Sequence, residues 1–364
     1  MEQKFNIPTV LIAPLDWGLG HATRCIPIIR ILTNSGWRVL LAANGNTATL
    51  LKNEFPNLTL LPLDGYNIHY TKKKWMLPIT MLLQVPKILL AIKKENSWLR
   101  KTIDKHQINL VISDNRYGLH SSQIPTIFIT HQLTIKMPFA WLETWVQKMN
   151  YNFIQKFTQC WVPDFKEAFN IAGTLSHPKF LPNTSTYYIG PLSRFTKNEV
   201  LNFQYDFCIL LSGPEPQRTL LEDIILKDVY HLREKIILVR GKPNALDTLS
   251  SSDNLTIYNH LSGEALNNVI QTSEYVISRS GYTTVMELLC LQKKSILIPT
   301  PAQTEQEYLA EKIYQQHWSY VVPQHQFNIQ SAIDEAKKFQ YHLPEINNET
   351  LSSTILKLIQ QLSK

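Results

Sequence analysis

The chain has 364 residues, of which 44% are hydrophobic and 18% are charged. This length is too great for one ordinary core and fits two domains, and the composition excludes a disordered protein. The formal net charge of +7 favours acidic partners, without choosing among nucleic acid, phosphorylated small molecules and an anionic membrane surface.

The four cysteines are widely spaced, and each lies in or beside an apolar segment. We therefore predict buried thiols in a reducing cytoplasm, with neither a disulfide framework nor a zinc site. The N-terminus lacks the basic start and long apolar run of a signal peptide, and no stretch of about 18 consecutive apolar residues occurs. We expect a cytoplasmic chain that does not span a membrane. The cysteines are Cys25, Cys160, Cys208 and Cys290.

The first predicted strand, residues 8–14, is a short apolar run typical of a parallel strand buried on both faces. A glycine-containing loop with Gly18, Gly20 and His21 leads from it into a predicted helix over residues 22–34. Glycines before a helix start favour anion binding. The unperturbed pKa of histidine lies near working pH, so His21 is a candidate general base. An electrostatic or hydrogen-bonding role for His21 stays open.

Strands and helices then alternate, with strands predicted at residues 37–43 and 58–63 and a helix between them. This alternation predicts a parallel sheet wound on both faces. Residues 71–101 break the pattern, because an apolar stretch is bracketed by lysines and by Trp75 and Trp98. Such a segment suits the interface of an anionic membrane. The alternative is a pair of amphipathic helices packed on the sheet with solvated lysines.

A later strand, residues 109–112, runs into Asp114, Asn115 and Arg116. Polar groups at the carboxyl end of a parallel strand face the crevice where ligands bind, so these three residues are candidates for a ligand site. Asp114 is equally suited to cap the following helix. A Trp- and Phe-rich helix over residues 139–157 is predicted as core. The domain boundary is predicted near residues 193–202, which gives domains 1–196 and 197–364.

The second domain opens with a predicted strand at residues 206–211, followed by a loop in which Gln217 and Arg218 have the reach to contact a phosphate oxygen. A strand at residues 235–239 ends at Arg240, and an arginine there is suited to hold a diphosphate in place of a metal ion. The sequence contains no Asp-x-Asp motif, so we predict that no metal is bound.

An apolar run at residues 275–277 breaks at Ser280 and Gly281 and passes into a segment of helical period. A phosphate suits this turn, because the N–H groups and the positive dipole end of the helix attract an anion and glycine permits its close approach. Glu287 then lies about one and a half turns inside the helix, where a carboxylate can accept hydrogen bonds from a ribose diol. A solvated helix face is the alternative for Glu287.

The order of these motifs resembles the donor-binding segment of GT-B glycosyltransferases of family 28. A Ser-Gly turn, a helix with a ribose-binding Glu, a Pro-ended strand at residues 295–299 and a Gln-containing helix at residues 304–308 occur in that family at similar spacing. The resemblance covers residues 206–318 and the loop that ends at His21. It implies an α/β protein of GT-B architecture, with two Rossmann-like domains whose parallel sheets face each other across a cleft.

The family resemblance also implies roles for individual residues. Ser212 and Gly213 match a loop that contacts the donor diphosphate or sugar in the family. Leu261 matches a position beside the uracil ring, and His21 matches a histidine near the sugar and the acceptor. The predicted donor-binding residues are Ser212, Gly213, Arg240, Leu261, Ser280, Gly281, Thr283, Thr284, Glu287, Gln306 and Glu307. The predicted acceptor-binding residues are Gly18, Gly20, Asp114, Asn115 and Arg116, with His21 as the catalytic candidate.

The resemblance implies an inverting hexosyltransferase that needs a UDP-sugar as co-substrate and no cofactor, and the lack of an Asp-x-Asp motif fits metal independence. N-acetylglucosamine is the preferred sugar, with galactose or glucose as alternatives, and a lipid-linked glycan or a lipopolysaccharide core is the preferred acceptor. We expect residues 71–101 to contact the inner face of the cell membrane. A UDP-N-acetylglucosamine 2-epimerase is one alternative. A nucleic-acid-binding protein is another, but the lysines are spread through the chain, so no nucleic-acid partner is expected.

Overall fold

The computed structural model describes residues 7–66, 77–137, 139–167, 169–199, 202–243 and 245–362. The chain divides into two compact units, of which the first is Met1–Leu192 with Asn348–Lys364 and the second is Ser193–Asn347. The break after Leu192 lies close to the predicted boundary. The last helix counts with the first unit, whereas the sequence prediction placed it in the second domain.

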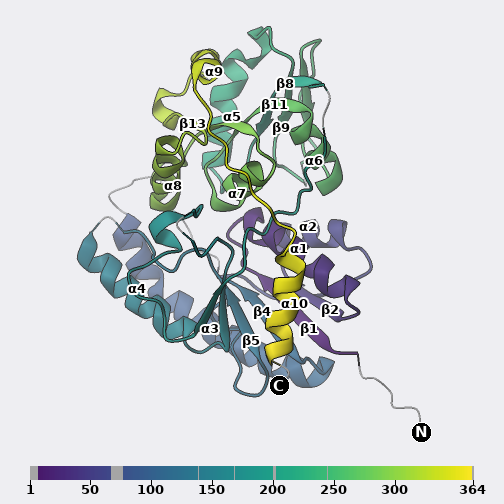
Figure 1. The fold of residues 1–364 in the computed structure, drawn as a ribbon, viewed down its shortest axis with the longest axis vertical. Coiled ribbons are helices and arrows are strands. Elements are labelled where there is room, and N and C mark those ends of the chain that lie inside the picture. The colour runs from purple at the N-terminus through teal and green to yellow at the C-terminus, as the bar shows by residue number, and fades with distance from the viewer. Residues whose placement is uncertain are drawn as a thin grey trace. The chain divides into compact units, whose positions relative to one another are not determined.

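The first unit is built on a seven-stranded parallel sheet of order β3-β2-β1-β4-β5-β6-β7 (Figure 1). Its central strands are short apolar runs buried along their whole length, as expected for a sheet covered on both faces. The strands are β1 (Thr9–Pro14), β2 (Arg38–Ala43), β3 (Thr59–Pro62), β4 (Leu110–Asp114), β5 (Thr126–Ile129), β6 (Gln159–Val162) and β7 (Ser185–Tyr188).

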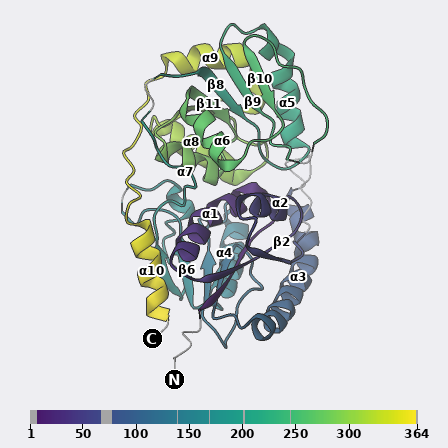
Figure 2. The ribbon, with the colours of Figure 1, turned by 90° about the vertical axis from the view of Figure 1, so that its right-hand side faces the viewer.

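Five α-helices of this unit are described, and Figure 2 shows α3 and α10 at opposite edges of the unit. The last of them, α10, contacts α1, and the Asn348 amide before it donates to the Pro191 carbonyl over 2.9 Å. The helices are α1 (Leu19–Asn34), α2 (Gly45–Glu54), α3 (Leu77–His106), α4 (Ala140–Ile154) and α10 (Leu351–Leu362), with a short 3₁₀ turn at Gly173–Leu175.

The segment predicted to meet a membrane, residues 71–101, is described only from residue 77 onward, and residues 71–76 lie outside the described residues. Its described part belongs to one helix, α3, rather than to a pair of helices. Ile92, Leu99 and Ile103 form the buried face of α3, while its lysines are exposed. This amphipathic packing matches one part of the alternative prediction.

The prediction that residues 139–157 form core is wrong for one face of α4. The side chains of Ile154 and Phe157 are buried, but Trp141 is 72% exposed and Trp145 is 46% exposed. Residues four apart lie on the same face of a helix, so the two tryptophans form one exposed stripe. The prediction rested on the number of aromatic residues in the segment, and that number does not show which of them lie on the exposed face of the helix.

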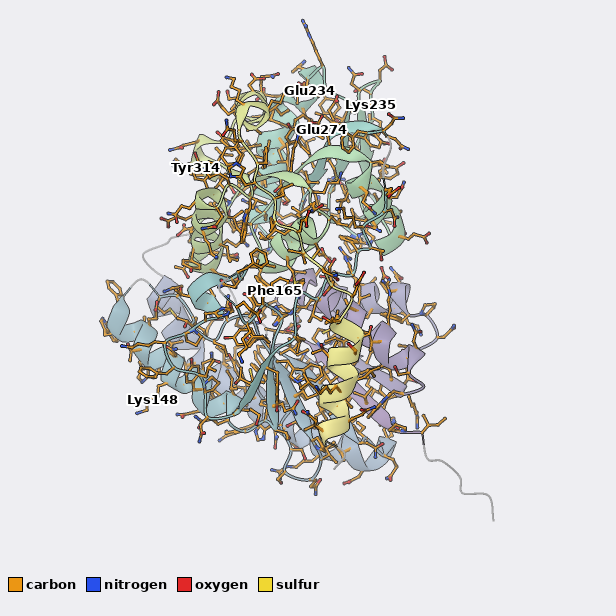
Figure 3. The ribbon with its side chains drawn as sticks, in the orientation of Figure 1. Lys148, Phe165, Glu234, Lys235, Glu274 and Tyr314 are labelled. Carbon is orange, nitrogen blue, oxygen red and sulfur yellow. The ribbon has the colours of Figure 1, made fainter. Side chains whose placement is uncertain are left out.

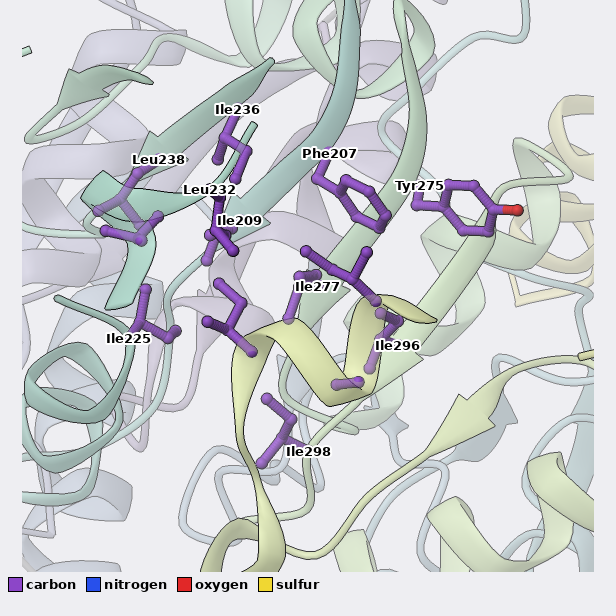
Figure 4. Packing of buried hydrophobic residues seen from close by; sticks show 14 of the residues in the cluster. Phe207, Ile209, Ile225, Leu232, Ile236, Leu238, Tyr275, Ile277, Ile296 and Ile298 are labelled. Atoms are coloured by element: carbon purple, nitrogen blue, oxygen red, sulfur yellow. The ribbon is translucent and has the colours of Figure 1, made fainter. Parts of the chain in front are cut away.

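The second unit is built on a six-stranded parallel sheet of order β10-β9-β8-β11-β12-β13. Figure 4 shows its core, in which Phe207, Ile277 and Ile296 come from three adjacent strands. The strands are β8 (Tyr205–Leu210), β9 (Ile236–Val239), β10 (Leu255–Tyr258), β11 (Ser273–Ser278), β12 (Lys294–Leu297) and β13 (Tyr320–Val321).

The helices of the second unit cover this core with amphipathic faces. In α9, for example, Ile329, Ala332, Ile333 and Ala336 are buried at helical spacing, and the Asn328 side chain caps the helix by accepting from the Ser331 N–H. The helices are α5 (Gln217–Asp228), α6 (Gly263–Gln271), α7 (Tyr282–Cys290), α8 (Thr304–Gln315) and α9 (Ile329–Lys338), with 3₁₀ turns at Val229–His231 and Gln324–Gln326.

The strand order reverses direction once in each sheet, between β1 and β4 in the first unit and between β8 and β11 in the second. Open parallel sheets bind ligands outside the carboxyl ends of their strands at such a switch point. The loop before His21 follows β1, and the Ser280–Gly281 turn follows β11. Both motifs singled out from the sequence therefore lie at the switch point of their own sheet.

Cys25, Cys160 and Cys208 are buried, as predicted, whereas Cys290 is only partly buried. All four are free thiols. Over the part of the chain that the structure describes, no helix combines the length and the apolar content needed to cross a membrane.

Candidate functional site

The first switch point brings the loop after β1 next to the end of β4, because Pro14 pairs with Asp114 in the sheet. Gly18 precedes α1 with a φ of 129°, a conformation that favours glycine, so the chain turns sharply into the helix. His21 lies in the first turn of α1, and its Nδ1 is 2.7 Å from Asp114 Oδ1. The predicted association of residues 18–21 with Asp114 is thus present in the structure.

The protonation of this pair follows from the buried carboxylate. Burial alone would raise the pKa of Asp114, but Arg24 and His21 outweigh it and lower that pKa to about 2. Asp114 is therefore ionised and can only accept hydrogen bonds, so His21 Nδ1 carries the proton that it donates. In the neutral ring the lone pair then lies on Nε2, and the His21 side chain is 16% exposed. This arrangement suits a general base.

The structure corrects two of the acceptor-site predictions. Asp114 is fully buried, and its oxygens are bound by His21 and by Arg24, which pairs with both of them. It does not cap a helix, and because both oxygens are bound within the protein it orients His21 instead. Asn115 differs, because its side chain is only partly buried and its backbone φ of 57° turns the chain away from β4. Its predicted acceptor contact stays a prediction.

Arg116 is the second correction. It is fully buried and donates from Nε to Glu95 Oε1 over 2.7 Å. The other Glu95 oxygen accepts from the Tyr66 hydroxyl over 2.7 Å and from the Gly118 N–H over 3.1 Å. Arg116 is thus a structural group that fastens α3 to the loop after β4, and it has no surface to offer an acceptor.

The second switch point joins the N-termini of α7 and α8. Ser280 Oγ donates to the Gln306 carbonyl over 2.9 Å, and a Cβ built on Gly281 would lie 3.9 Å from Gln306 Nε2. The positive end of the α7 dipole points at this turn, where Thr283 is buried and Thr284 partly buried in the first helical turn. Ser280, Gly281 and Gln306, predicted separately, therefore lie together.

The side chains of Gln306 and Glu307 hold the loop in front of α8. Gln306 Oε1 accepts from the Thr300 N–H over 3.0 Å, and its Nε2 donates to Gln303 Oε1 over 2.6 Å. Glu307 Oε1 accepts from the Ala302 N–H over 3.3 Å. Both residues shape the site, and their predicted contacts with a hexose stay predictions.

Glu287 is 4% exposed, so the alternative of a solvated helix face is wrong. Burial raises the pKa of Glu287, while Arg194 opposes that shift from an Nε that lies 3.0 Å from Glu287 Oε1. Arg194 was missed in the sequence because it belongs to no motif. A buried carboxylate such as that of Glu287 requires a cation as its partner. The one signal in the sequence was therefore that Arg194 is a cation close to the predicted domain boundary.

Arg240 is committed to other side chains, which corrects its predicted diphosphate contact. Its Nε donates to Glu222 Oε1 over 2.6 Å, and its Nη1 to Asn259 Oδ1 over 2.8 Å. Arg218, a second predicted phosphate contact, donates to the other oxygen of Glu222 over 3.1 Å. Glu222 therefore binds both arginines, while Glu215 also pairs with Arg218 and Asp247 with Arg240. The sequence offered no motif that identified Glu222.

The remaining donor candidates lie on neighbouring loops of the second unit. A Cβ on Gly241 would lie 2.3 Å from the Leu211 carbonyl, so the loop after β9 lies directly against the loop that holds Ser212 and Gly213. Gly213 has a φ of 106°, which favours glycine. Leu261 is partly buried just before α6. The donor contacts of these three residues stay predictions.

Arg279 is a buried cation directly before the Ser280–Gly281 turn and is 1% exposed. It donates only to carbonyl groups, among them that of Gln217 over 2.6 Å and that of Ile298 over 3.4 Å. Within the described residues no carboxylate pairs with it, and its Nε has no partner. Burial lowers the pKa of Arg279 to about 10, so it is still charged at neutral pH. The second switch point therefore holds an unbalanced positive charge.

Among the described residues, no group of three or more His, Cys, Asp or Glu side chains is arranged to hold a metal ion.

Residues 217–362 match the glycosyltransferase family 28 C-terminal domain. A similar curated protein is the UDP-N-acetylglucosamine–N-acetylmuramyl-(pentapeptide) pyrophosphoryl-undecaprenol N-acetylglucosamine transferase of Clostridium novyi, with 26% identity over 136 residues, which are 35% of this chain and 38% of that protein. The matched region thus spans about two fifths of that relative. The predicted resemblance to family 28 is confirmed for the C-terminal domain.

The fold is shared with solved glycosyltransferases along nearly the whole chain. MurG of Acinetobacter baumannii aligns with a TM-score of 0.52 and 14% identity, covering 98% of this chain and 99% of that one. The glycosyltransferase SnogD from Streptomyces nogalater aligns with a TM-score of 0.59 and 11% identity, covering 98% of this chain and 99% of that one. These likenesses confirm the predicted GT-B class, with two parallel α/β sheets.

Proposed function

We propose that this chain, which carries a glycosyltransferase family 28 C-terminal domain, moves a hexose from a UDP-sugar to an acceptor hydroxyl. The observation that carries the proposal is the second switch point. There the Ser280–Gly281 turn, the α7 dipole and the buried charge of Arg279 favour an anion, within a unit whose residues match the family. A nucleotide diphosphate is an anion of this kind.

In the proposed reaction the acceptor oxygen attacks the anomeric carbon of the donor. The bond between that carbon and the diphosphate oxygen breaks, and UDP leaves with the electron pair. His21 Nε2 takes the proton of the acceptor hydroxyl, with Asp114 holding the ring at Nδ1. The charge that grows on the diphosphate is stabilised by the α7 N-terminus and by Arg279. Attack opposite to the leaving group inverts the anomeric centre.

We further propose that N-acetylglucosamine is the transferred sugar and that the acceptor is a lipid-linked glycan. The support is the Clostridium novyi relative, whose name gives both a UDP-N-acetylglucosamine donor and an undecaprenol-linked acceptor. Galactose or glucose, and a lipopolysaccharide core, are the variants to be tested beside them.

A lipid-linked acceptor calls for contact with a membrane surface, and we propose that α3 and α4 supply it. Leu90 on α3 is 59% exposed between the exposed Lys87 and Lys94, at helical spacing. On α4, Trp141 and Trp145 continue into the exposed Lys148, which Figure 3 shows projecting from the helix. Tryptophan suits the headgroup level and lysine suits anionic lipid. This surface would place the protein at the inner face of the cell membrane.

The activity is tested by measuring UDP release from a panel of UDP-sugars, with and without a lipid extract. We expect one donor to be turned over only when lipid is present. Glu287→Ala is expected to raise the donor concentration required, and Glu335→Ala, on the exposed face of α9, is the matched control. Isomerisation of the donor without UDP release would support the 2-epimerase instead. If no UDP-sugar in the panel binds, the proposed function is wrong.

The membrane contact is tested by cosedimentation with vesicles that contain anionic lipid. The double variant Trp141→Ser with Trp145→Ser is expected to lose most of the binding. Leu246→Ser, at a 98% exposed position of the second unit, is the control for loss of an exposed apolar side chain. Equal sedimentation of the double variant and the unmodified protein would rule out α4 as the contact.

A further inference from the structure

Arg24 occupies the centre of the first switch point, one helical turn after His21, and is 1% exposed. Its Nε and Nη2 pair with the two oxygens of Asp114. Its Nη1 lies 2.8 Å from Nδ1 of His131, and its Nη2 lies 3.0 Å from Nδ1 of His21. One guanidinium thus touches the carboxylate and both histidines around it.

The hydrogen bonds fix where the protons of the two histidines lie. A guanidinium has donors only, so His131 Nδ1 must accept, and the His131 proton lies on Nε2. The Asp114 carboxylate has acceptors only, so His21 Nδ1 must donate to it. The contact of Arg24 with His21 Nδ1 places two donors on the same Asp114 oxygen. His131 is therefore neutral in this arrangement, and His21 is neutral when its Nε2 carries no proton.

The charges of the groups around His21 support the same protonation. Arg24 and Cys25 face Asp114 from α1, and His131 faces Arg24 from the loop after β5. Burial raises the pKa of the Cys25 thiol well above its usual range, so that thiol is neutral. Arg24 and Asp114 then cancel, and the cluster of these five groups is neutral when both histidines are neutral. Without Arg24, the carboxylate would favour a protonated His21.

We propose that Arg24 is a positioning residue that balances the charge of Asp114 and thereby keeps His21 neutral, with its lone pair on Nε2. The catalytic consequence rests on the proposed transferase activity, whereas the protonation of His21 does not. If Arg24 only ties α1 to β4 and another group sets the protonation of His21, removing the charge of Arg24 leaves the titration of His21 unmoved.

The test is a titration of the histidine rings by NMR on the full chain, with the His21 signal assigned from its loss in His21→Ala. We expect Arg24→Met to raise the midpoint of the His21 titration by at least one pH unit and Arg24→Lys to restore most of the original value. Arg30→Met, at a half-exposed position of the same helix paired with Glu54, is the matched control and should leave the midpoint unchanged. An unchanged midpoint in Arg24→Met overturns the proposal.

A second measurement needs no variant at position 24 and holds if Arg24→Met does not fold. Nitrogen chemical shifts of the unmodified protein at neutral pH should report a proton on Nδ1 of His21 and on Nε2 of His131. The reverse protonation, or a protonated His21, would overturn the proposal. The pH profile of UDP release then separates the two claims. Suppose that Arg24→Met raises the midpoint of the His21 titration but leaves the acidic side of the pH profile of UDP release unchanged. The role of Arg24 would then stand, and His21 would be ruled out as the general base.

Discussion

The two switch points hold similar buried arginines in opposite electrical settings. In the first unit, Arg24 pairs with both oxygens of Asp114, so the positive charge is matched within the protein. In the second unit, Arg279 donates to carbonyl groups, and the described residues place no carboxylate against it. A matched charge is suited to orienting a neutral group, whereas an unmatched one favours an anionic ligand.

This difference fits the two roles in the proposed reaction, in which the first switch point accepts a proton and the second binds the leaving group. At the first switch point, the charge balance that we propose leaves His21 neutral and able to take a proton. At the second, the α7 dipole and Arg279 add positive potential of the same sign, which a diphosphate would neutralise. Changing one arginine should therefore affect proton transfer, and changing the other should affect binding of UDP.

The largest effect is expected from His21→Ala. Loss of a positioned general base typically costs about 10²- to 10⁴-fold in rate, so kcat should fall by that factor. Binding of UDP should stay unchanged, because His21 belongs to the other unit. Steady-state UDP release and calorimetry measure the two quantities, with His231→Ala, exposed on the second unit, as the control. A normal kcat in His21→Ala would remove the proposed base.

Arg279→Gln should weaken UDP binding while the titration of His21 stays as it is. Hydrogen bonds to charged groups contribute about 1.5–3 kcal/mol, which corresponds to about 10- to 100-fold in Kd. Calorimetric titration with UDP at two salt concentrations measures the loss and its salt dependence. Arg233→Gln, at an exposed position of the same unit, is the matched control. Equal Kd values for Arg279→Gln and the unmodified protein would contradict the anion site.

Asp114 predicts a pH dependence of stability in the first unit. Burial raises its pKa, but Arg24 and His21 bring the folded value down to about 2, below the ordinary value of 3.8. The unfolded chain therefore binds the proton first, and this stability is lost as the pH falls from about 4 to about 2. Urea unfolding should show the free-energy gap between the unmodified protein and Asp114→Asn narrowing by about 2 kcal/mol over that range. A free-energy difference between the two proteins that stays constant over this pH range would contradict the prediction.

The smallest effect is expected from Ser280→Ala. The variant removes the bond from Ser280 Oγ to the Gln306 carbonyl, a buried hydrogen bond of 2.9 Å. Such a bond contributes about 1 kcal/mol, so thermal unfolding should show a modest loss of stability, and the KM for the donor should rise a few-fold. The variant Ser353→Ala, on the exposed side of α10, serves as the control. A Ser280→Ala variant as stable as the control would show that this bond does not hold the turn.

The strand and helix alternation could be predicted because each element carries its own local pattern. The segments that form β1 and β4 are short, mainly apolar runs, and the Ser280–Gly281 turn directly precedes α7. The loop positions of His21 and Ser280 followed from chain order. Local patterns of this kind extend over neighbouring residues, which is why they were readable in a single sequence.

The partners of buried charges could not be predicted in the same way. Arg116 binds Glu95, 21 positions earlier, and Arg240 binds Glu222, 18 positions earlier, with no motif joining either pair. Both arginines follow strands where ligands are expected, so the sequence favoured ligand contacts. Only the folded arrangement separates a charge that a carboxylate already balances from one that awaits a ligand, as the contrast with Arg279 shows.

The position of α10 in the first unit has a consequence for the order in which this protein is made. Leu351, Ile355, Leu358 and Ile359 form its buried face, and the helix contacts α1. All residues of the second unit are synthesised before α10 leaves the ribosome. The second unit therefore has its complete sequence while the first still lacks a packing element, so the surface of α1 that α10 covers stays exposed in a nascent chain until α10 has left the ribosome.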